Sequence, residues 1–261
     1  MSKIKIKFVA LVFYFLTFLF FDCSAFATGG RNLTIFAEPN ISLALTKIAR
    51  LYSQKHDVIV SVNFNSSADL INSIDSGEPA DIFISAHPDW IEILQQKGLV
   101  DVYNTGLVAR DSLVLITSKS NRNIPESLNR EHISIEESLQ ILDQNKATLI
   151  IDYTGNSSGK FSDDLLKKMS LFNLQVFRKL AEDKSPVFNN VKAGDSYYAL
   201  LLASQVREHS DYKTLATKDA GTLYRALVIA GNNMDIAREF LKFLKTEPAK
   251  KILQQNGFGD I

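Results

Sequence analysis

The sequence predicts an α/β fold with two lobes, the second inserted into the first. Short apolar runs typical of buried strands alternate with amphipathic stretches of about ten residues, which indicates right-handed βαβ units on mostly parallel sheets. The character of the chain changes near Ser112, and a further apolar run follows Gly221. We therefore expect lobe I to comprise residues 28–112 and 223–261, and lobe II to comprise residues 113–222, with two crossover connections between them.

Three strand–helix pairs are expected in the first hundred residues. The run Val58–Phe64 alternates apolar and other side chains as a half-buried strand does, and the apolar residues of 41–52 recur on one helical face. The helix over 90–97 should end at Gly98, because glycine favours the left-handed conformation that follows many helices. The expected strands are 33–36, 58–64 and 81–85, and the expected helices are 41–52, 68–76 and 90–97.

The rest of the chain continues the alternation. A polar stretch over 118–130 is expected to form the longest loop, and residues 234–253 should form a helix, a turn and a second helix. The expected strands are 113–117, 148–152, 198–203 and 226–230, and the other expected helices are 135–145 and 162–180.

Residues 1–27 have the layout of a secretory signal peptide. Three lysines precede an apolar run over 8–21, and Ala25 and Ala27 are small residues suited to cleavage after position 27. The run is shorter than the roughly 20 residues that span a bilayer, which argues against an uncleaved anchor. We expect the mature protein in the periplasm, without the single cysteine, Cys23.

Composition excludes several functional classes. The 29 basic and 29 acidic residues leave no net charge that would attract nucleic acid or an anionic membrane. A mature chain without cysteine has neither a disulfide nor a thiolate nucleophile, and the four histidines show no paired metal-ligand spacing. Each histidine is expected at the surface or in a loop.

Three polar turns follow buried strands and lead into helices. They are residues 36–40, 64–67 and 152–160, and they carry Asn40, Ser67 and Ser158 near the expected helix N-termini. Free backbone N–H groups and the positive end of the helix dipole make such termini suited to anions. Each could be an ordinary helix cap. If the three converge on one cleft, they form an oxyanion site without a formal positive charge.

Enzyme motifs are absent or incomplete. The run Gly155–Lys160 resembles a phosphate-binding loop, but it is one residue short and is followed by Phe161 instead of serine or threonine. No G-x-S-x-G motif is present. An exported hydrolase or transferase that uses Ser158 and Lys160 as nucleophile and base stays a less favoured alternative. We expect no enzyme activity and no cofactor.

Several of these segments together resemble the family of periplasmic molybdate-binding proteins (ModA). The run 64–70 is similar to the family's F-x-S-S-x-x-L motif, and 76–86 is similar to its G-x-P-A-D-[LIV]-F-[IV]-S-A motif. Residues 36–40 stand where members carry F-A-A-A-S, and 257–259 resemble the terminal G-F motif. The similarity runs from about Asn32 to the C-terminus and is thin between residues 120 and 224.

The resemblance implies a two-lobed periplasmic binding protein of class II. Such a protein holds molybdate or tungstate in a cleft between the lobes and delivers it to an inner-membrane ABC permease; a monomer is expected. By position, Asn40, Ser67, Ser158 and Lys184 would contact the oxyanion, with the metal itself held only through its oxygens.

One departure from the family bears on the ligand. Leu202 stands where many members have a ligand tyrosine, and its side chain cannot donate a hydrogen bond. The alternative ligand on the same fold is a different small anion or an organic acid.

Overall fold

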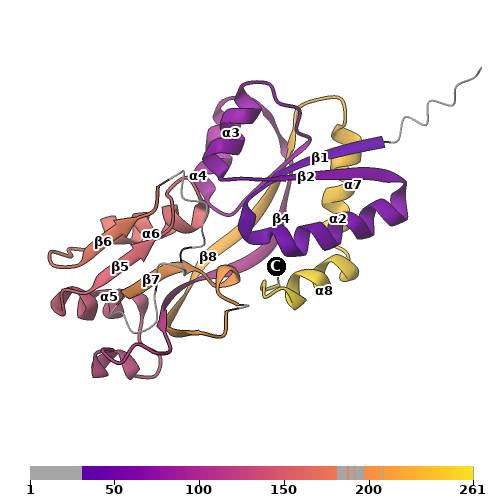
Figure 1. The fold of residues 1–261 in the computed structure, drawn as a ribbon. Coiled ribbons are helices and arrows are strands. Elements are labelled where there is room, and N and C mark those ends of the chain that lie inside the picture. The colour runs from indigo at the N-terminus through magenta and orange to yellow at the C-terminus, as the bar shows by residue number, and fades with distance from the viewer. Residues whose placement is uncertain (1–30, 181–186, 188–190, 192–196, 208, 261) are drawn as a thin grey trace, which may run out of the picture. The chain divides into compact units, whose positions relative to one another are not determined.

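The computed structural model describes residues 31–260 apart from residues 181–186, 188–190, 192–196 and 208 (Figure 1). The expected signal peptide, residues 1–27, lies outside the described residues, as does the predicted ligand Lys184. Among the described residues, no helix combines the length and hydropathy needed to cross a bilayer.

The described strands form one eight-stranded sheet in the order β2-β1-β3-β8-β4-β7-β5-β6. Strand β1 pairs in parallel with β2 and β3, and β5 pairs in parallel with β6 and β7. The central pairs, β3 with β8, β8 with β4 and β4 with β7, are antiparallel. The strands are β1 (Arg31–Ala37), β2 (Val58–Phe64), β3 (Ile82–Ser85), β4 (Val100–Ser118), β5 (Thr148–Ile151), β6 (Gln175–Arg178), β7 (Tyr197–Leu202) and β8 (Tyr212–Ile229).

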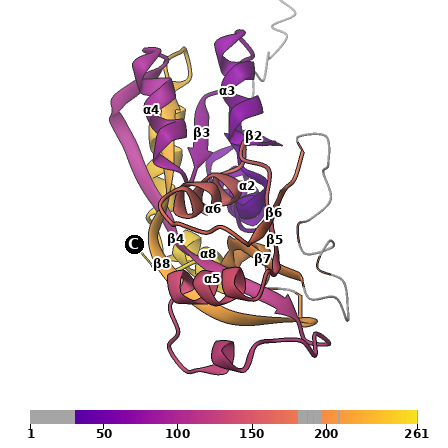
Figure 2. The ribbon, with the colours of Figure 1, turned by 90° about the vertical axis from the view of Figure 1, so that its left-hand side faces the viewer.

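Helices flank this sheet, and the α/β class is confirmed. Figure 2 shows α3 and α4 near one end of the sheet and α5 near the other. The helices are α2 (Ser42–His56), α3 (Ser67–Asp75), α4 (Pro88–Gln96), α5 (Ile135–Gln144), α6 (Ser157–Lys167), α7 (Met234–Leu244) and α8 (Glu247–Gln255), with short 3-10 turns η1 (Pro39–Ile41), η2 (Glu126–Asn129) and η4 (Ala203–Gln205).

The long strands β4 and β8 connect the two ends of the sheet. They pair with each other over most of their length, and the register shifts between Leu107 and Ala109 and again between Asp111 and Leu113. The strands expected at 113–117 and 226–230 are therefore only parts of longer ones. The described strands form a single sheet, so separate sheets for the two lobes are not observed. The division into two lobes stays a prediction.

Most predicted elements of the first hundred residues are confirmed. Strand β2 has the predicted limits, and the apolar face of α2 is buried, with Leu45, Ile48 and Tyr52 fully inaccessible. Gly98 follows the last turn of α4 with φ of 68°, a left-handed conformation that glycine adopts without strain. The helix–turn–helix over 234–253 is also confirmed as α7 and α8.

The helix predicted over 162–180 is wrong in its second half. Helix α6 ends at Lys167, and residues 175–178 form β6, which pairs with β5 at the edge of the sheet. Three of the four side chains of β6 are exposed, so this edge strand lacks the apolar run that predicted the others.

Candidate anion-binding site

A buried carboxylate lies at the carboxyl end of β1. Glu38 directly follows β1 and precedes Pro39, the first residue of η1. Its backbone N–H donates to the carbonyl of Ile84 at 3.3 Å, which continues the pairing of β1 with β3. The side chain of Glu38 is fully inaccessible to solvent. A buried carboxylate is costly unless hydrogen-bond donors surround it.

The donors converge on one of its two oxygens. Oε1 of Glu38 accepts hydrogen bonds from the Ser67 hydroxyl, from the Ser85 hydroxyl at 3.1 Å and from the Ser157 hydroxyl at 2.5 Å. The backbone N–H of Ser157 donates to the same oxygen at 3.1 Å. All three serines are buried, and the Ser85 and Ser157 hydroxyl oxygens lie 3.2 Å apart. We call these three serines the serine cluster.

The fold brings the serine cluster together from three segments. Ser67 is the first residue of α3, whose N-cap is Ser66, and Ser157 is the first residue of α6, whose N-cap is Asn156. Ser85 is the last residue of β3. Two helix N-termini therefore direct donors and the positive ends of their dipoles at one point.

Close packing fixes the start of α6. A Cβ atom on Gly159 would lie 2.3 Å from the carbonyl oxygen of Tyr153 and 2.4 Å from that of Asp152, so only glycine fits there. The backbone N–H of Ala68 in α3 donates to the carbonyl of Gly155 at 3.1 Å. These contacts hold the N-termini of α3 and α6 beside each other.

The serine cluster is thus an anion-binding arrangement, and the anion it holds here is the protein's own carboxylate. Burial raises the pKa of Glu38, and the hydrogen bonds from Ser157, Ser67 and Ser85 lower it by less. The second oxygen, Oε2, is buried without a hydrogen-bond partner.

A second group of buried polar atoms faces the Tyr224 hydroxyl. Burial raises the pKa of Tyr224 well above its usual value, the charges of Asp111 and Glu38 raise it further, and the polar groups of Ser204 and Asn40 lower it. The Tyr224 hydroxyl, Asp111 Oδ2, the Ser204 hydroxyl and Asn40 Nδ2 are each buried without a hydrogen-bond partner. Groups of this kind are usually satisfied by internal water or by a ligand.

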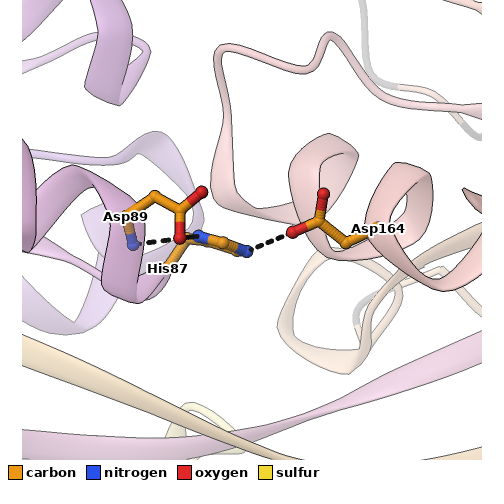
Figure 3. Close-up of side chains that lie close together, drawn as sticks. All are labelled: His87, Asp89 and Asp164. Atoms are coloured by element: carbon orange, nitrogen blue, oxygen red, sulfur yellow. Dashed lines mark hydrogen bonds and ion pairs between the residues drawn. The ribbon is translucent and has the colours of Figure 1, made fainter.

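Polar contacts connect His87, in the turn before α4, with Asp89 of α4 and Asp164 of α6 (Figure 3). His87 Nδ1 accepts from the backbone N–H of Asp89 at 3.2 Å, and Nε2 lies 3.2 Å from Asp164 Oδ2. Lys160 Nζ lies 2.7 Å from Asp89 Oδ2. Burial lowers the pKa of His87, and the charge of Asp89 offsets this only in part. The distances among His87, Asp89 and Asp164 would suit a cation, but the Lys160 ammonium already supplies the positive charge.

The structure brings together some of the residues predicted from sequence. Ser67 lies in the serine cluster, whereas Ser158 is displaced by one residue: its hydroxyl accepts from the Leu202 N–H at 3.3 Å, away from Glu38. Asn40 lies in η1, faces Tyr224 and does not cap α2. The oxyanion contacts of these residues stay predictions.

Three central residues were missed: Glu38, Ser85 and Ser157. The sequence signal that could have identified Glu38 is its position: it directly follows an apolar strand and precedes proline. A charged residue at the end of a buried strand stands out because charged residues are rarely buried unless they are paired. Ser157 was missed because α6 begins at Ser157, five residues before the helix expected over 162–180.

The hydrolase alternative gains no support from these contacts. Ser158 is fully buried and its hydroxyl accepts a backbone hydrogen bond. Burial lowers the pKa of Lys160, but the hydrogen bonds to Asp89 and Asp164 and the charges of these two carboxylates together raise it by more, so the net pKa is raised. A general base requires the opposite shift.

The class of protein is shown by the family to which the sequence belongs. The profile of a family described as bacterial extracellular solute-binding protein matches residues 33–259, and the chain therefore belongs to that family.

His87 lies in a loop as expected, but it is buried at 3% exposure.

The resemblance to molybdate-binding proteins is confirmed by named relatives. The chain is 26% identical over 243 residues to the molybdate-binding protein ModA of Haemophilus influenzae, covering 90% of this chain and 92% of that one. It is 23% identical over 248 residues to ModA of Escherichia coli, covering 90% and 91%. The tungstate ABC transporter structure from Geobacter sulfurreducens superposes with a TM-score of 0.69 at 15% identity, covering 86% of this chain and 98% of that one.

Proposed function

We propose that this protein captures a small tetrahedral oxyanion, of the molybdate or tungstate class, in the periplasm and delivers it to an ABC importer in the inner membrane. The observation that carries this proposal is the convergence of the serine cluster and the Ser157 N–H on one buried anionic oxygen. The names of the relatives and the signal-like residues 1–27 support the same function.

The donor set suits recognition by size and hydrogen-bond count. Hydroxyl and amide donors carry no formal charge, so the number and direction of their hydrogen bonds decide which oxyanion they hold. Each lone pair of the bound oxyanion that is left without a donor would lower the affinity. Ser67 and Ser85 belong to the predicted lobe I, whereas Ser157 belongs to the predicted lobe II. In our proposal the ligand therefore closes the two lobes on each other through a hinge in β4 and β8.

Titration calorimetry of the purified, anion-stripped protein tests the function. Molybdate, tungstate, sulfate and phosphate are titrated in turn, and at least one should bind. Ser67→Ala should weaken that binding by about 1–3 kcal/mol, because a buried donor is lost. The matched control is Ser76→Ala, whose exposed hydroxyl bonds only to backbone carbonyls of α3. Absence of heat with every oxyanion and every carboxylate tested would refute solute capture by this site.

A second candidate ligand is a small organic acid. The group that the serine cluster holds in this structure is a carboxylate. The same donors could therefore bind the carboxylate of a small organic acid in place of a tetrahedral oxyanion. The same titrations with acetate, lactate and succinate distinguish the two. Binding of a carboxylate without binding of any oxyanion would replace the first candidate with this one.

A further inference from the structure

The donors of the candidate site are already engaged by the protein itself. Oε1 of Glu38 accepts from all three residues of the serine cluster, and Glu38 is fully buried. An oxyanion that approached these donors would meet a carboxylate with no water between them. Two like charges about 4 Å apart repel by about 4 kcal/mol at an effective dielectric constant of 20. One proton held between the two anions removes this repulsion.

We propose that Glu38 determines the specificity of this site and that the oxyanion binds together with one proton, held between Oε2 of Glu38 and a ligand oxygen. This inference rests on the proposed function. The proton comes from a solvent or buffer acid, or arrives on the ligand; an O–H bond forms at Oε2 or is kept on the ligand oxygen, the only bond broken is that between the proton and its donor, and no other covalent bond changes. Glu38 then contacts the ligand as a neutral hydrogen-bond donor.

The geometry at the two carboxylate oxygens supports this arrangement. Oε1 is saturated with donors, whereas Oε2 is buried and has no partner. A proton on Oε2 gives that oxygen a hydrogen to donate to the ligand, while Oε1 stays the acceptor of those serine-cluster donors that do not turn to the ligand. Burial, which raises the pKa of Glu38, favours the same protonated form.

The surrounding elements carry other titratable groups. They are His87 after β3, Lys160 on α6, Asp111 on β4 and Tyr224 on β8. Lys160 is held by an ion pair, and the pKa of Tyr224 is raised, so both stay protonated near neutral pH. His87 has a lowered pKa and stays neutral. Asp111, with a pKa of about 6, is the competing proton acceptor among these groups.

The proposal has a consequence for ligand choice. Molybdate, tungstate and sulfate are fully ionised near neutral pH and must take the proton from solvent, whereas hydrogen phosphate brings its own. The affinity for molybdate should therefore fall about tenfold for each pH unit above the pKa of Glu38. Glu38→Gln should abolish this dependence, because the amide Oε1 can accept from the serine cluster and the amide N–H donates where the carboxyl proton would.

Calorimetry with molybdate as the probe tests the inference. Titrations at about pH 6, 7 and 8 in two buffers with different ionisation heats count the protons taken up. The proton uptake per molybdate should rise towards one in the wild-type protein as the pH is raised above the pKa of Glu38, whereas Glu38→Gln should take up none at any pH and should bind more tightly than the wild type at the highest pH. Glu247→Gln, an exposed glutamate on α8, serves as the matched control and should behave as the wild type does.

The outcomes separate this inference from the function on which it rests. Molybdate binding to the wild type with no proton uptake and the same affinity at all three pH values would overturn the role of Glu38 and leave oxyanion capture intact. Proton uptake that persists in Glu38→Gln but disappears in Asp111→Asn would assign the proton to Asp111, which also overturns it. If Glu38→Gln does not fold, the proton count in the wild type and in Asp111→Asn decides. Absence of molybdate binding in every variant would overturn both proposals.

Discussion

Ser157 is expected to contribute much more to stability than its neighbour Ser158. The Ser157 hydroxyl donates to the Glu38 carboxylate at 2.5 Å and accepts from the His87 N–H at 2.8 Å. A hydrogen bond to a charged group contributes about 1.5–3 kcal/mol, and a buried N–H left without an acceptor costs about 1–3 kcal/mol. Part of this loss is offset when Glu38 takes up a proton. We expect Ser157→Ala to lower the free energy of unfolding by about 3 kcal/mol.

The matched substitution is Ser158→Ala. The Ser158 hydroxyl accepts from the Leu202 N–H at 3.3 Å, but that N–H also donates to Gln205 Oε1 at 3.1 Å. The substitution therefore leaves no donor unpaired at this position and should cost only about 1 kcal/mol. Both serines are fully buried and both substitutions remove one oxygen atom, so the difference reports the hydrogen bonds.

Urea unfolding followed by circular dichroism measures both values. The midpoint should shift to lower urea for Ser157→Ala with an unchanged slope, and only slightly for Ser158→Ala. Equal shifts for the two variants, or a larger shift for Ser158→Ala, would refute the assignment of Ser157 to the serine cluster.

Three further predictions use the same unfolding assay. Gly159→Ala should lower the free energy of unfolding by about 1–3 kcal/mol, because the new Cβ would lie 2.3 Å from the Tyr153 carbonyl oxygen. Gly231→Ala, whose Cβ would have no atom within 4 Å, should be close to neutral, and equal effects would contradict the packing argument. Asp111 has a pKa raised to about 6 by burial, so its folded form binds more protons than the unfolded form between about pH 4 and 6, and stability falls as pH rises through that window. Asp111→Asn should therefore stabilise the protein by about 1–3 kcal/mol at pH 7 and flatten the profile, and a variant less stable than the wild type there would be evidence against it. Asp143→Ala removes the acceptor of the Asn173 and Leu174 backbone N–H groups, at 2.6 and 2.7 Å, just before β6, and should lower the free energy of unfolding by about 2 kcal/mol. An unchanged urea midpoint would show that Asp143 does not stabilise this turn.

Local sequence patterns were sufficient for elements whose burial alternates clearly. Strand β2 alternates between the two faces of the sheet, and its limits were predicted without error. The long strands β4 and β8 were only partly predicted, because their register shifts and their exposed stretches interrupt the alternation. Edge strand β6 has almost no buried residue, so nothing distinguished it from the preceding helix.

The site was predicted in kind but not in detail. The prediction of helix N-termini that gather around an anion identified Ser67 and came within one residue of Ser157. A shift of one residue turns a helical side chain by about 100°, which is enough to direct Ser158 towards β7 instead of Glu38. Only the place of Glu38 at the end of an apolar strand indicated it in the sequence, because its burial depends on three segments that are distant along the chain.

The position of β8 affects when the protein can fold during its synthesis. This strand, residues 212–229, lies between β3 and β4, so it joins strands made much earlier at the middle of the sheet. Close to the end of the chain, Gly259 pairs with Arg110 of β4 through two backbone hydrogen bonds of 2.9 and 3.1 Å. A nascent chain still attached to the ribosome lacks these contacts and leaves the edges of β3 and β4 unpaired. Completion of the sheet must therefore wait until residues 212–229 and Gly259 have been synthesised, and in the export proposed above this delay would leave time for the chain to reach the translocation machinery before it folds.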